Sequence, residues 1–448
     1  MSTLAHPAPA IASARPASGV RIVQAFVVVL LACQVALLVP AIGPLRMFVR
    51  MAAFGVSLAL LVSVRGPGRP HPAQFPALIV TGLLGLALLR PETVNLTAGA
   101  AQAGLYLAVF APLFWVARLT VDMSTVRQTA ALMWIFHTAS AALGVLQVQF
   151  PGRFQPPLSS IIVAKGHGYI STLMITNAAG VRVFRPMGLT DIPGGASVSA
   201  LYAVLFGMGF FLTARSVRMR AAAAASMGAG FTCLYLSQVR SVLLMTAIAV
   251  AVVIGVLAWR RDLQRLALLG ATAVCVVLGG YAAATALAGP AVARRMASLT
   301  TQRPGTVYYN SRGKFFMDAM TETLPGAPFG TGLGHWGMTA SYFGDRHDPY
   351  ATWVEIQWAA WVVDGGAPLM LAYCAMLLVS LLAVWRVARM RAPAGTPDLP
   401  FWAGVVLAHG VGAVALTFSF PLFVSQPGMD FWLLNALLLA AARTASPA

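Results

Sequence analysis

The side chains best suited to chemistry lie in one polar segment, from about residue 290 to residue 355, between two long apolar runs. Five of the twelve acidic residues of the protein are in this segment. His347 and Glu355 are the two side chains there that are best suited to take a proton from a hydroxyl nucleophile. A single histidine in a loop is more often an ordinary solvated residue, so both stay candidates for a catalytic base. The charged residues of the segment, with one of its histidines, are Arg294, Arg295, Arg303, Arg312, Lys314, Asp318, Glu322, Asp345, Arg346, His347, Asp348 and Glu355.

Arg240 lies between two apolar runs that are joined by almost no loop, in the sequence Ser237-Gln238-Val239-Arg240-Ser241. A charge at this depth of a membrane is costly unless it faces a polar cavity or a partner. A guanidinium group keeps its charge and matches phosphate oxygens with two donors. Arg240 is therefore a candidate anion ligand, and snorkelling to the membrane surface is the alternative.

Arg185 precedes a Pro- and Gly-rich stretch that leads into the apolar run at 193–213. A Gly-rich entry to a helix leaves backbone N–H groups free, and these groups suit an anion. Asp191 lies in the same stretch, and in a purely structural alternative it caps the helix and pairs with Arg185. Both interpretations remain open at this point.

Two further patterns in the polar segment have an ordinary and a functional interpretation. Gly330, Gly332 and Gly334 form a Gly-rich run, but no P-loop lysine follows at the required spacing, so a tight turn is expected. Three tryptophans follow, and they fit either an aromatic belt at a membrane interface or platforms on which sugars stack. These are Trp353, Trp358 and Trp361.

The elements that must position these residues are membrane helices. The chain has 448 residues, of which 59% are hydrophobic and only 9% are charged, far below the quarter that is usual in soluble domains. Apolar runs long enough to span a bilayer recur along it. The fold class expected is all-α, a polytopic bundle of about twelve transmembrane helices with one large periplasmic loop that contains short helices. The runs are approximately 22–41, 46–64, 74–89, 95–117, 128–149, 193–213, 221–237, 241–259, 266–289, 364–385, 400–420 and 429–443.

Arginine clusters in three short connectors predict the orientation. They lie at residues 215–220, 260–265 and 386–391, and the positive-inside rule makes these connectors cytoplasmic. Alternation then puts both termini inside, and puts loop 150–192, the turn at Arg240 and loop 290–355 outside. The expected organisation is a disordered cytoplasmic tail at 1–20, nine helices at 21–289, a periplasmic loop at 290–363 and three helices at 364–448. The basic residues expected outside are Arg153, Lys165, Arg182, Arg185, Arg240, Arg294, Arg295, Arg303, Arg312, Lys314 and Arg346.

The order of several short motifs resembles the bacterial O-antigen ligase and polysaccharide polymerase family of membrane glycosyltransferases, which are GT-C-like. Arg185-x-x-Gly-x-x-Asp191 precedes a mid-chain helix, and Ser237-x-x-Arg240-Ser241 opens another. Arg312 with its short helix, a Pro/Gly-rich segment around Phe329-Gly330 and an acidic-Gly pair at Asp364 follow. The resemblance covers roughly residues 180–385.

The resemblance implies an enzyme that takes a polyprenyl-diphosphate-linked glycan, such as an undecaprenyl diphosphate carrier, as donor at the periplasmic face of the bacterial inner membrane. It implies O-antigen or exopolysaccharide synthesis with no cofactor and no metal. The diphosphate ligands would be Arg185, Arg240 and Arg312, and Asp191, Lys314 and Trp353 would be secondary substrate contacts. The expected partners are a glycan or lipid A-core acceptor, membrane lipid and a chain-length regulator, with no nucleic acid.

One departure from the family pattern concerns the base. Ligases of the family carry a His-Asn dipeptide about nine residues before the acidic-Gly pair, and nine residues before Asp364 stands Glu355. His347-Asp348 resembles the dipeptide but lies eight residues too early. This favours a polymerase over a ligase and leaves His347 and Glu355 as alternatives. A transporter or flippase of a lipid-linked glycan is the alternative from another functional class.

Overall fold

The computed structural model describes residues 17–163, 166–301, 303–345, 347–349, 351–393 and 395–445. It is 76% helical, and the described residues contain a single two-stranded sheet. The expected all-α fold class is therefore confirmed. Two of the basic residues expected outside, Lys165 and Arg346, lie outside the described residues, as does most of the predicted N-terminal tail.

Every predicted apolar run coincides with a helix. The run expected to begin at residue 22 already begins at Ala17, and the one expected at 364 begins at Gln357. The twelve helices are α1 (Ala17–Ala36), α2 (Arg46–Ser63), α3 (Gln74–Leu88), α4 (Leu96–Phe110), α6 (Met123–Gln149), α10 (Ala196–Thr213), α11 (Val217–Ser237), α12 (Arg240–Trp259), α13 (Leu263–Ala288), α19 (Gln357–Arg389), α20 (Leu399–Leu416) and α21 (Gln426–Ala445).

Nine helical segments among the described residues are long and apolar enough to cross a membrane. The chain is thus a multi-pass membrane protein. Helix α3 is apolar but has only 15 residues, which at 1.5 Å per residue fall short of the hydrocarbon thickness. The predicted number of twelve transmembrane helices stays a prediction.

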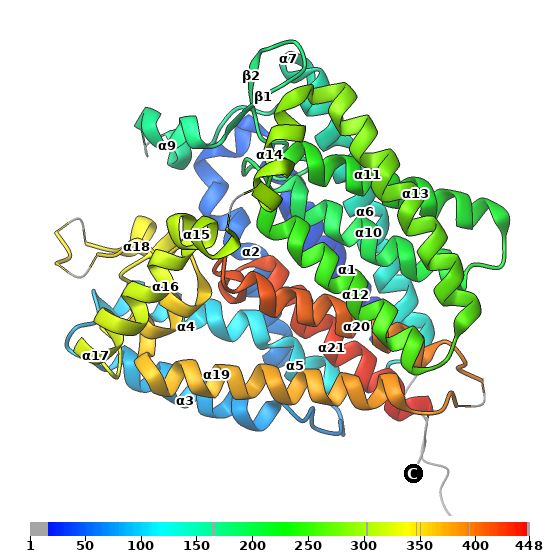
Figure 1. The fold of residues 1–448 in the computed structure, drawn as a ribbon. Coiled ribbons are helices and arrows are strands. Elements are labelled where there is room, and N and C mark those ends of the chain that lie inside the picture. Colours follow the sequence, from blue (N-terminus) through cyan, green and yellow to red (C-terminus); the bar gives the residue numbers. More distant parts are fainter. Residues whose placement is uncertain are drawn as a thin grey trace, which may run out of the picture.

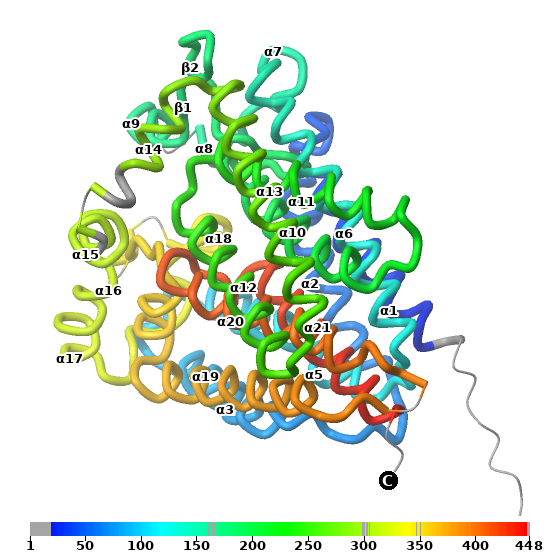
Figure 2. Tube along the Cα trace, turned by 45° about the vertical axis from the view of Figure 1, so that its right-hand side comes forward, coloured from blue at the N-terminus to red at the C-terminus, as the bar shows by residue number. Residues whose placement is uncertain are grey.

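The connectors between these helices gather at two opposite ends of the bundle (Figures 1 and 2). At one end, which we call the basic end, Arg260 Nη1 donates to the carbonyls of Ala388 and Met390 at 3.1 and 3.2 Å. Thr444 Oγ1 donates to the Val121 carbonyl at 2.8 Å, which fixes the C-terminal helix at this end. Two of the three arginine clusters therefore meet, as the predicted alternation requires.

The opposite end, which we call the loop end, carries most of the segments that do not belong to the twelve helices. They include a hairpin of β1 (Met174–Thr176) and β2 (Arg182–Phe184), with Ile175 opposite Val183. Figure 1 shows this hairpin, α9 and α14–α18 along the upper and left edges. The short helices here are α7 (Pro151–Phe154), α8 (Ser160–Val163), α9 (Gly166–Thr172), α14 (Pro290–Thr301), α15 (Pro304–Tyr308), α16 (Lys314–Asp318), α17 (Leu324–Gly326) and α18 (Gly337–Phe343).

The short helix expected around Arg312 is part of a longer helical stretch. Two π-helical segments, η3 (Tyr309–Gly313) and η4 (Ala319–Thr323), join α15, α16 and α17. Segments of this kind are rare and are often found at functional sites, because the widened turn redirects a side chain. Arg312 lies in the first of them. The remaining short elements are α5 (Pro112–Trp115), η1 (Pro40–Leu45), η2 (Val116–Arg118) and η5 (Leu422–Val424).

The core lies where α10, α20 and α21 pack, and nearly all of α20 and α21 is buried. Trp361 is fully buried there, with its ring stacked on Tyr373 at a centroid distance of 4.9 Å. The interpretation of Trp361 as part of an interfacial belt or as a sugar platform is therefore wrong. Trp353, by contrast, is 46% exposed at the loop end.

A kink in α19 anchors the Gly-rich segment. Gly366 has φ +64°, and a Cβ added there would lie 2.1 Å from the Pro328 carbonyl oxygen. Gly330 has φ +82°, and its added Cβ would lie 2.7 Å from the backbone of Gly365. The two glycines allow the backbones to touch, which confirms the expected tight turn.

Candidate active site

Four arginines from distant parts of the chain converge at the loop end. Arg185 follows β2, Arg240 begins α12, Arg295 lies on α14 and Arg312 lies in η3. The pKa of Arg185 is lowered by burial and by the positive charges of Arg312 and Arg240. Burial and the charges of Arg240 and Arg185 likewise lower the pKa of Arg295. We call these four residues the arginine cluster; it contains the three predicted diphosphate ligands.

One member of the cluster, Arg240, lines a cavity of about 510 Å³. Arg240 and Arg303 supply its cationic groups, and Asn310 and Ser311 supply neutral polar ones. Thr306 and Val307 complete the lining. The expectation that Arg240 faces a polar cavity is thus met by this geometry. A cavity lined by a fixed cation and by hydrogen-bonding side chains suits an anionic ligand.

Glu355 supplies the negative charge at the cluster. Its carboxylate forms an ion pair with Arg312, whose side chain is 41% exposed. The indole nitrogen of Trp353 donates to the other carboxylate oxygen at 2.6 Å. The ring of Trp353 meets Tyr169 edge to face at 6.0 Å, so α9 also contributes to this part of the site. Three predicted site residues are therefore linked, since Trp353 contacts Glu355 and Glu355 contacts Arg312.

Asp191 forms its ion pair with a residue other than Arg185, the partner that the sequence suggested. Its buried carboxylate forms an ion pair with Arg50 of α2, and Arg46 lies 3.7 Å away. The cap position of α10 is Gly195, with no side-chain cap hydrogen bond. The interpretation that Asp191 caps this helix and pairs with Arg185 is wrong. The reason is that α2 brings two arginines to the loop end, which spacing along residues 185–195 could not show.

The turn that follows Arg185 is clamped on α6. The Gln147 side chain accepts from the backbone N–H groups of Met187 and Gly188 at 2.8 and 2.7 Å, and it donates to the Gly188 carbonyl at 3.0 Å. Ser140 Oγ accepts from the Leu189 N–H at 3.0 Å. Gly188 has φ +63°, and an added Cβ would lie 2.4 Å from Ser140 Oγ. The clamp fixes the backbone that carries Arg185.

Arg185 itself is a partly buried cation. Its Nε is buried and has no hydrogen-bond partner among the described residues. No ion pair of Arg185 is found there either. Because leaving a buried donor unpaired is costly, the position is poised for an added acceptor.

His347 and Lys314 lie outward. The His347 side chain is 94% exposed, with its Nδ1 3.6 Å from Asp345. Lys314 is exposed on α16, two residues after Arg312, and forms no ion pair with a described residue. The structure thus brings Glu355, but not His347, into contact with the arginine cluster.

A second histidine, which the sequence pattern did not single out, is buried in the Gly-rich segment. His335 Nδ1 lies 2.8 Å from Asp348 Oδ2, and its Nε2 lies 3.0 Å from the Thr331 carbonyl oxygen. Both ring nitrogens are used to hold the loop together, so its role here is structural. Its flanking glycines, Gly334 and Gly337, were the only signal of a close-packed histidine.

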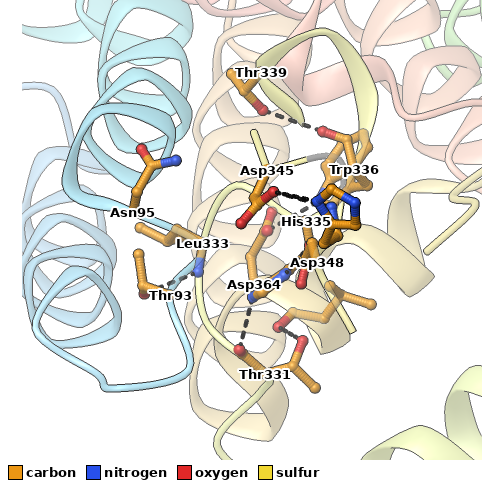
Figure 3. Close-up of polar contacts among 12 residues, drawn as sticks. Thr93, Asn95, Thr331, Leu333, His335, Trp336, Thr339, Asp345, Asp348 and Asp364 are labelled. Carbon is orange, nitrogen blue, oxygen red and sulfur yellow. Dashed lines mark hydrogen bonds and ion pairs between the residues drawn. The ribbon is translucent and has the colours of Figure 1, made fainter. Parts of the chain in front are cut away.

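The same segment is tied to the membrane helices by a buried carboxylate. Asp364 accepts from Tyr106 at 2.8 Å, from Trp336 at 2.9 Å and from Gln102 at 3.3 Å. Figure 3 shows Asp364 beside the loop and Leu333 bonded to Thr93 of the chain before α4. This acidic-Gly pair is therefore a structural anchor under the site.

Within the described residues, no group of three or more His, Cys, Asp or Glu side chains is placed to hold a metal ion. The four cysteines are unpaired and lie in the helices α1, α11, α13 and α19.

No protein-family model matches the chain, and no curated protein matches it either.

Proposed function

We propose that this protein is a membrane-embedded glycosyltransferase that acts on a polyprenyl-diphosphate-linked glycan at the loop end, with that end facing the periplasm. In this proposal it lies in the bacterial inner membrane with both termini cytoplasmic. One observation carries the proposal: Arg185, Arg240 and Arg312 form one cluster with Arg295. In the sequence, Arg185 and Arg240 are 55 residues apart (240 minus 185), and Arg240 and Arg312 are 72 residues apart (312 minus 240). Four mutually repelling cations at a membrane surface favour a ligand with several negative charges.

The arginines act on the leaving group. Cleavage of the bond between the anomeric carbon and the diphosphate oxygen leaves an additional negative charge on the diphosphate. Fixed guanidinium donors stabilise that charge without reorganisation during the reaction. The unpaired Nε of Arg185 and the cavity beside Arg240 support this assignment.

Glu355 is the base that this geometry favours. Its ion pair with Arg312 holds the carboxylate beside the diphosphate position. A bound diphosphate would compete for Arg312 and release a carboxylate oxygen toward the acceptor hydroxyl. Glu355 would then take the hydroxyl proton as the acceptor oxygen attacks the anomeric carbon.

The acceptor side is formed by two aromatic residues, of which Trp353 is exposed and Tyr169 is half-buried. Trp353 and Tyr169 present an edge-to-face pair next to Glu355. Flat aromatic surfaces suit the apolar faces of sugar rings, so the pair fits a growing glycan. The proposal is therefore polymerisation of a surface polysaccharide, with ligation to a lipid A-core as the second outcome of the test.

The test combines a reconstituted reaction with surface-glycan profiles of cells. The protein in lipid nanodiscs receives a short synthetic polyprenyl-diphosphate-linked repeat unit, and the products are separated by length. Arg185→Gln, Arg240→Gln and Arg312→Gln should each lower the rate by about 10²-fold or more, as removal of one transition-state donor does. Arg153→Gln is the matched control, because Arg153 is an exposed arginine of the loop end on α7.

The cellular products distinguish the functions. A polymerase variant leaves single repeat units without long chains, and a ligase variant accumulates unlinked lipid-bound polymer. A flippase variant gives no product outside the membrane at all, which would contradict glycosyl transfer. Parental behaviour of all three arginine variants would show that the site assignment is wrong.

A further inference from the structure

The basic end contains a second cavity, of about 320 Å³, between α19, α21 and the connector from α2 to α3. Three arginines reach it from three segments of the chain: Arg69, Arg386 and Arg443. The other lining residues are mostly apolar. They are Pro72, Ala383, Val387, Met390, Leu439 and Ala442.

The backbone partly fixes this arginine group. The Arg443 guanidinium donates to the carbonyl of Arg69 and, at 2.7 Å, to that of Pro70. These bonds satisfy donors of Arg443 but neutralise no charge. They hold Arg443 against the connector that carries Arg69, so two of the three cations are kept together by the fold.

The carboxylates of the basic end are engaged elsewhere. Asp122 caps α6, with its Oδ1 accepting from the Thr125 N–H at 2.8 Å. Asp262 and Asp398 both face Arg265, and Asp398 also lies 3.8 Å from Arg127. Among the described residues, no ion pair is formed by Arg69, Arg386 or Arg443. The cavity therefore concentrates positive charge, and no carboxylate among the residues that the structure describes is paired with it.

The apolar wall continues along the outside of α19 toward the middle of the bundle. Ala383 and Val387 line the cavity one turn apart, at the helical spacing of four residues. Leu382 and Leu378 lie one and two turns before Arg386 and are 45% and 58% exposed. Leu371 is 63% exposed two further turns away. A cationic pocket thus leads into an exposed apolar stripe.

We propose that this cavity binds the phosphate headgroup of an anionic phospholipid, whose acyl chain lies along the exposed leucines of α19. The cavity is at the end of α19, a helix long and apolar enough to cross a membrane, and the ends of such helices lie at the level of the lipid phosphates. Basic pockets between transmembrane helices suit anionic headgroups, because guanidinium donors match phosphodiester oxygens. Inorganic phosphate offers the same phosphate oxygens without an acyl chain. Its binding therefore distinguishes free phosphate from a lipid headgroup as the ligand of the cavity.

The experiment measures lipid binding to the full chain in neutral detergent. Phosphatidylglycerol, phosphatidylcholine and inorganic phosphate are titrated separately, and bound lipid is counted by native mass spectrometry alongside the thermal unfolding temperature. The test variant is Arg69→Gln with Arg386→Gln; both side chains are exposed and neither forms an ion pair with a described residue. The matched control is Arg389→Gln with Arg391→Gln, which removes the same charge from the same end, and the ring of Trp385 rather than the cavity lies under Arg389 at 5.6 Å.

The expected result is retention of phosphatidylglycerol by the parent and by the control, with an apparent Kd about tenfold weaker in the test variant. Phosphatidylcholine should be held at least about tenfold more weakly than phosphatidylglycerol by the parent. Equal weakening in test and control variants would overturn the proposal, because it would show a diffuse charge effect. Full displacement of the lipid by millimolar inorganic phosphate would overturn it too, since the acyl chain would then contribute nothing.

Discussion

The contact between Glu355 and Arg312 gives the candidate site its most specific feature at the scale of single residues. A carboxylate beside an arginine cluster reduces the repulsion among the cations. The indole of Trp353 fixes the second oxygen of the same carboxylate. Arg312 and Trp353 therefore fix the orientation of the Glu355 carboxylate. His347 lies on an exposed turn, where its ion pair among the described residues is with Asp345.

Replacing Glu355 by Gln tests which side chain is the base. The amide keeps the shape but cannot take a proton, so the rate constant kcat should fall by about 10²- to 10⁴-fold with KM for the lipid-linked donor changed much less. His347→Gln should leave kcat within about twofold. The measurement is the rate of chain elongation in nanodiscs.

Glu322→Gln is the matched control, because Glu322 lies in η4 of the same segment and is exposed. A large loss of kcat in His347→Gln together with full activity in Glu355→Gln would reverse the assignment.

At the scale of elements, the kink of α19 connects the site to the membrane bundle. The helix passes through Gly366 with φ +64°, and the Ala367 N–H donates to the Pro328 carbonyl at 2.9 Å. The Gly-rich segment is attached to the same place, since the Thr331 N–H donates to the Val363 carbonyl at 2.8 Å. Movement of the kink would therefore move the segment that ends at Trp353 and Glu355.

Gly366→Ala should destabilise the protein strongly. A non-glycine residue at this φ and at ψ −154° costs about 1–3 kcal/mol, and its Cβ would also lie 2.1 Å from the Pro328 carbonyl oxygen. We expect a lower thermal unfolding temperature in detergent and loss of activity together. Gly326→Ala is the control, because nothing lies within 4 Å of its added Cβ. Equal stability of the two variants would show that the kink is not constrained in this way.

At the scale of the whole molecule, the two ends of the bundle have different chemistry. The basic end carries the arginine connectors and the cavity of Arg69, Arg386 and Arg443. The loop end carries the arginine cluster and its cavity. A glycan outside the cytoplasm can reach only the cavity at the end that faces outward. The orientation of the protein in the membrane therefore decides which of the two cavities such a glycan can enter.

Single cysteines at the two ends should react with membrane-impermeant maleimide from opposite sides. Ser311→Cys at the loop end should be labelled in cells whose outer membrane has been permeabilised, and Arg391→Cys at the basic end only after lysis. Both positions are exposed. The background is a variant with Cys33, Cys233, Cys275 and Cys374 replaced by Ala. Labelling of Arg391→Cys in intact cells would invert the proposed topology.

The sequence by itself determined the membrane helices and which connectors share an end. Hydropathy is a local property, so a run such as 241–259 becomes α12 whatever it packs against. Two of the connectors rich in arginine meet at one end, at 260–265 and 386–391, because every second crossing returns the chain to the same side. The arginines that could bind a phosphate were visible because a charge next to an apolar run is conspicuous.

Only the tertiary structure decided which of those residues meet. Asp191 pairs with Arg50 from 141 positions away, and Glu355 rather than His347 reaches Arg312. Trp361 turned out to be core and Gln147 to be the clamp under the Arg185 turn. Such pairings depend on how distant helices pack, since a side chain's partners are set by the crossing of its helix with its neighbours and not by the residues beside it in the chain.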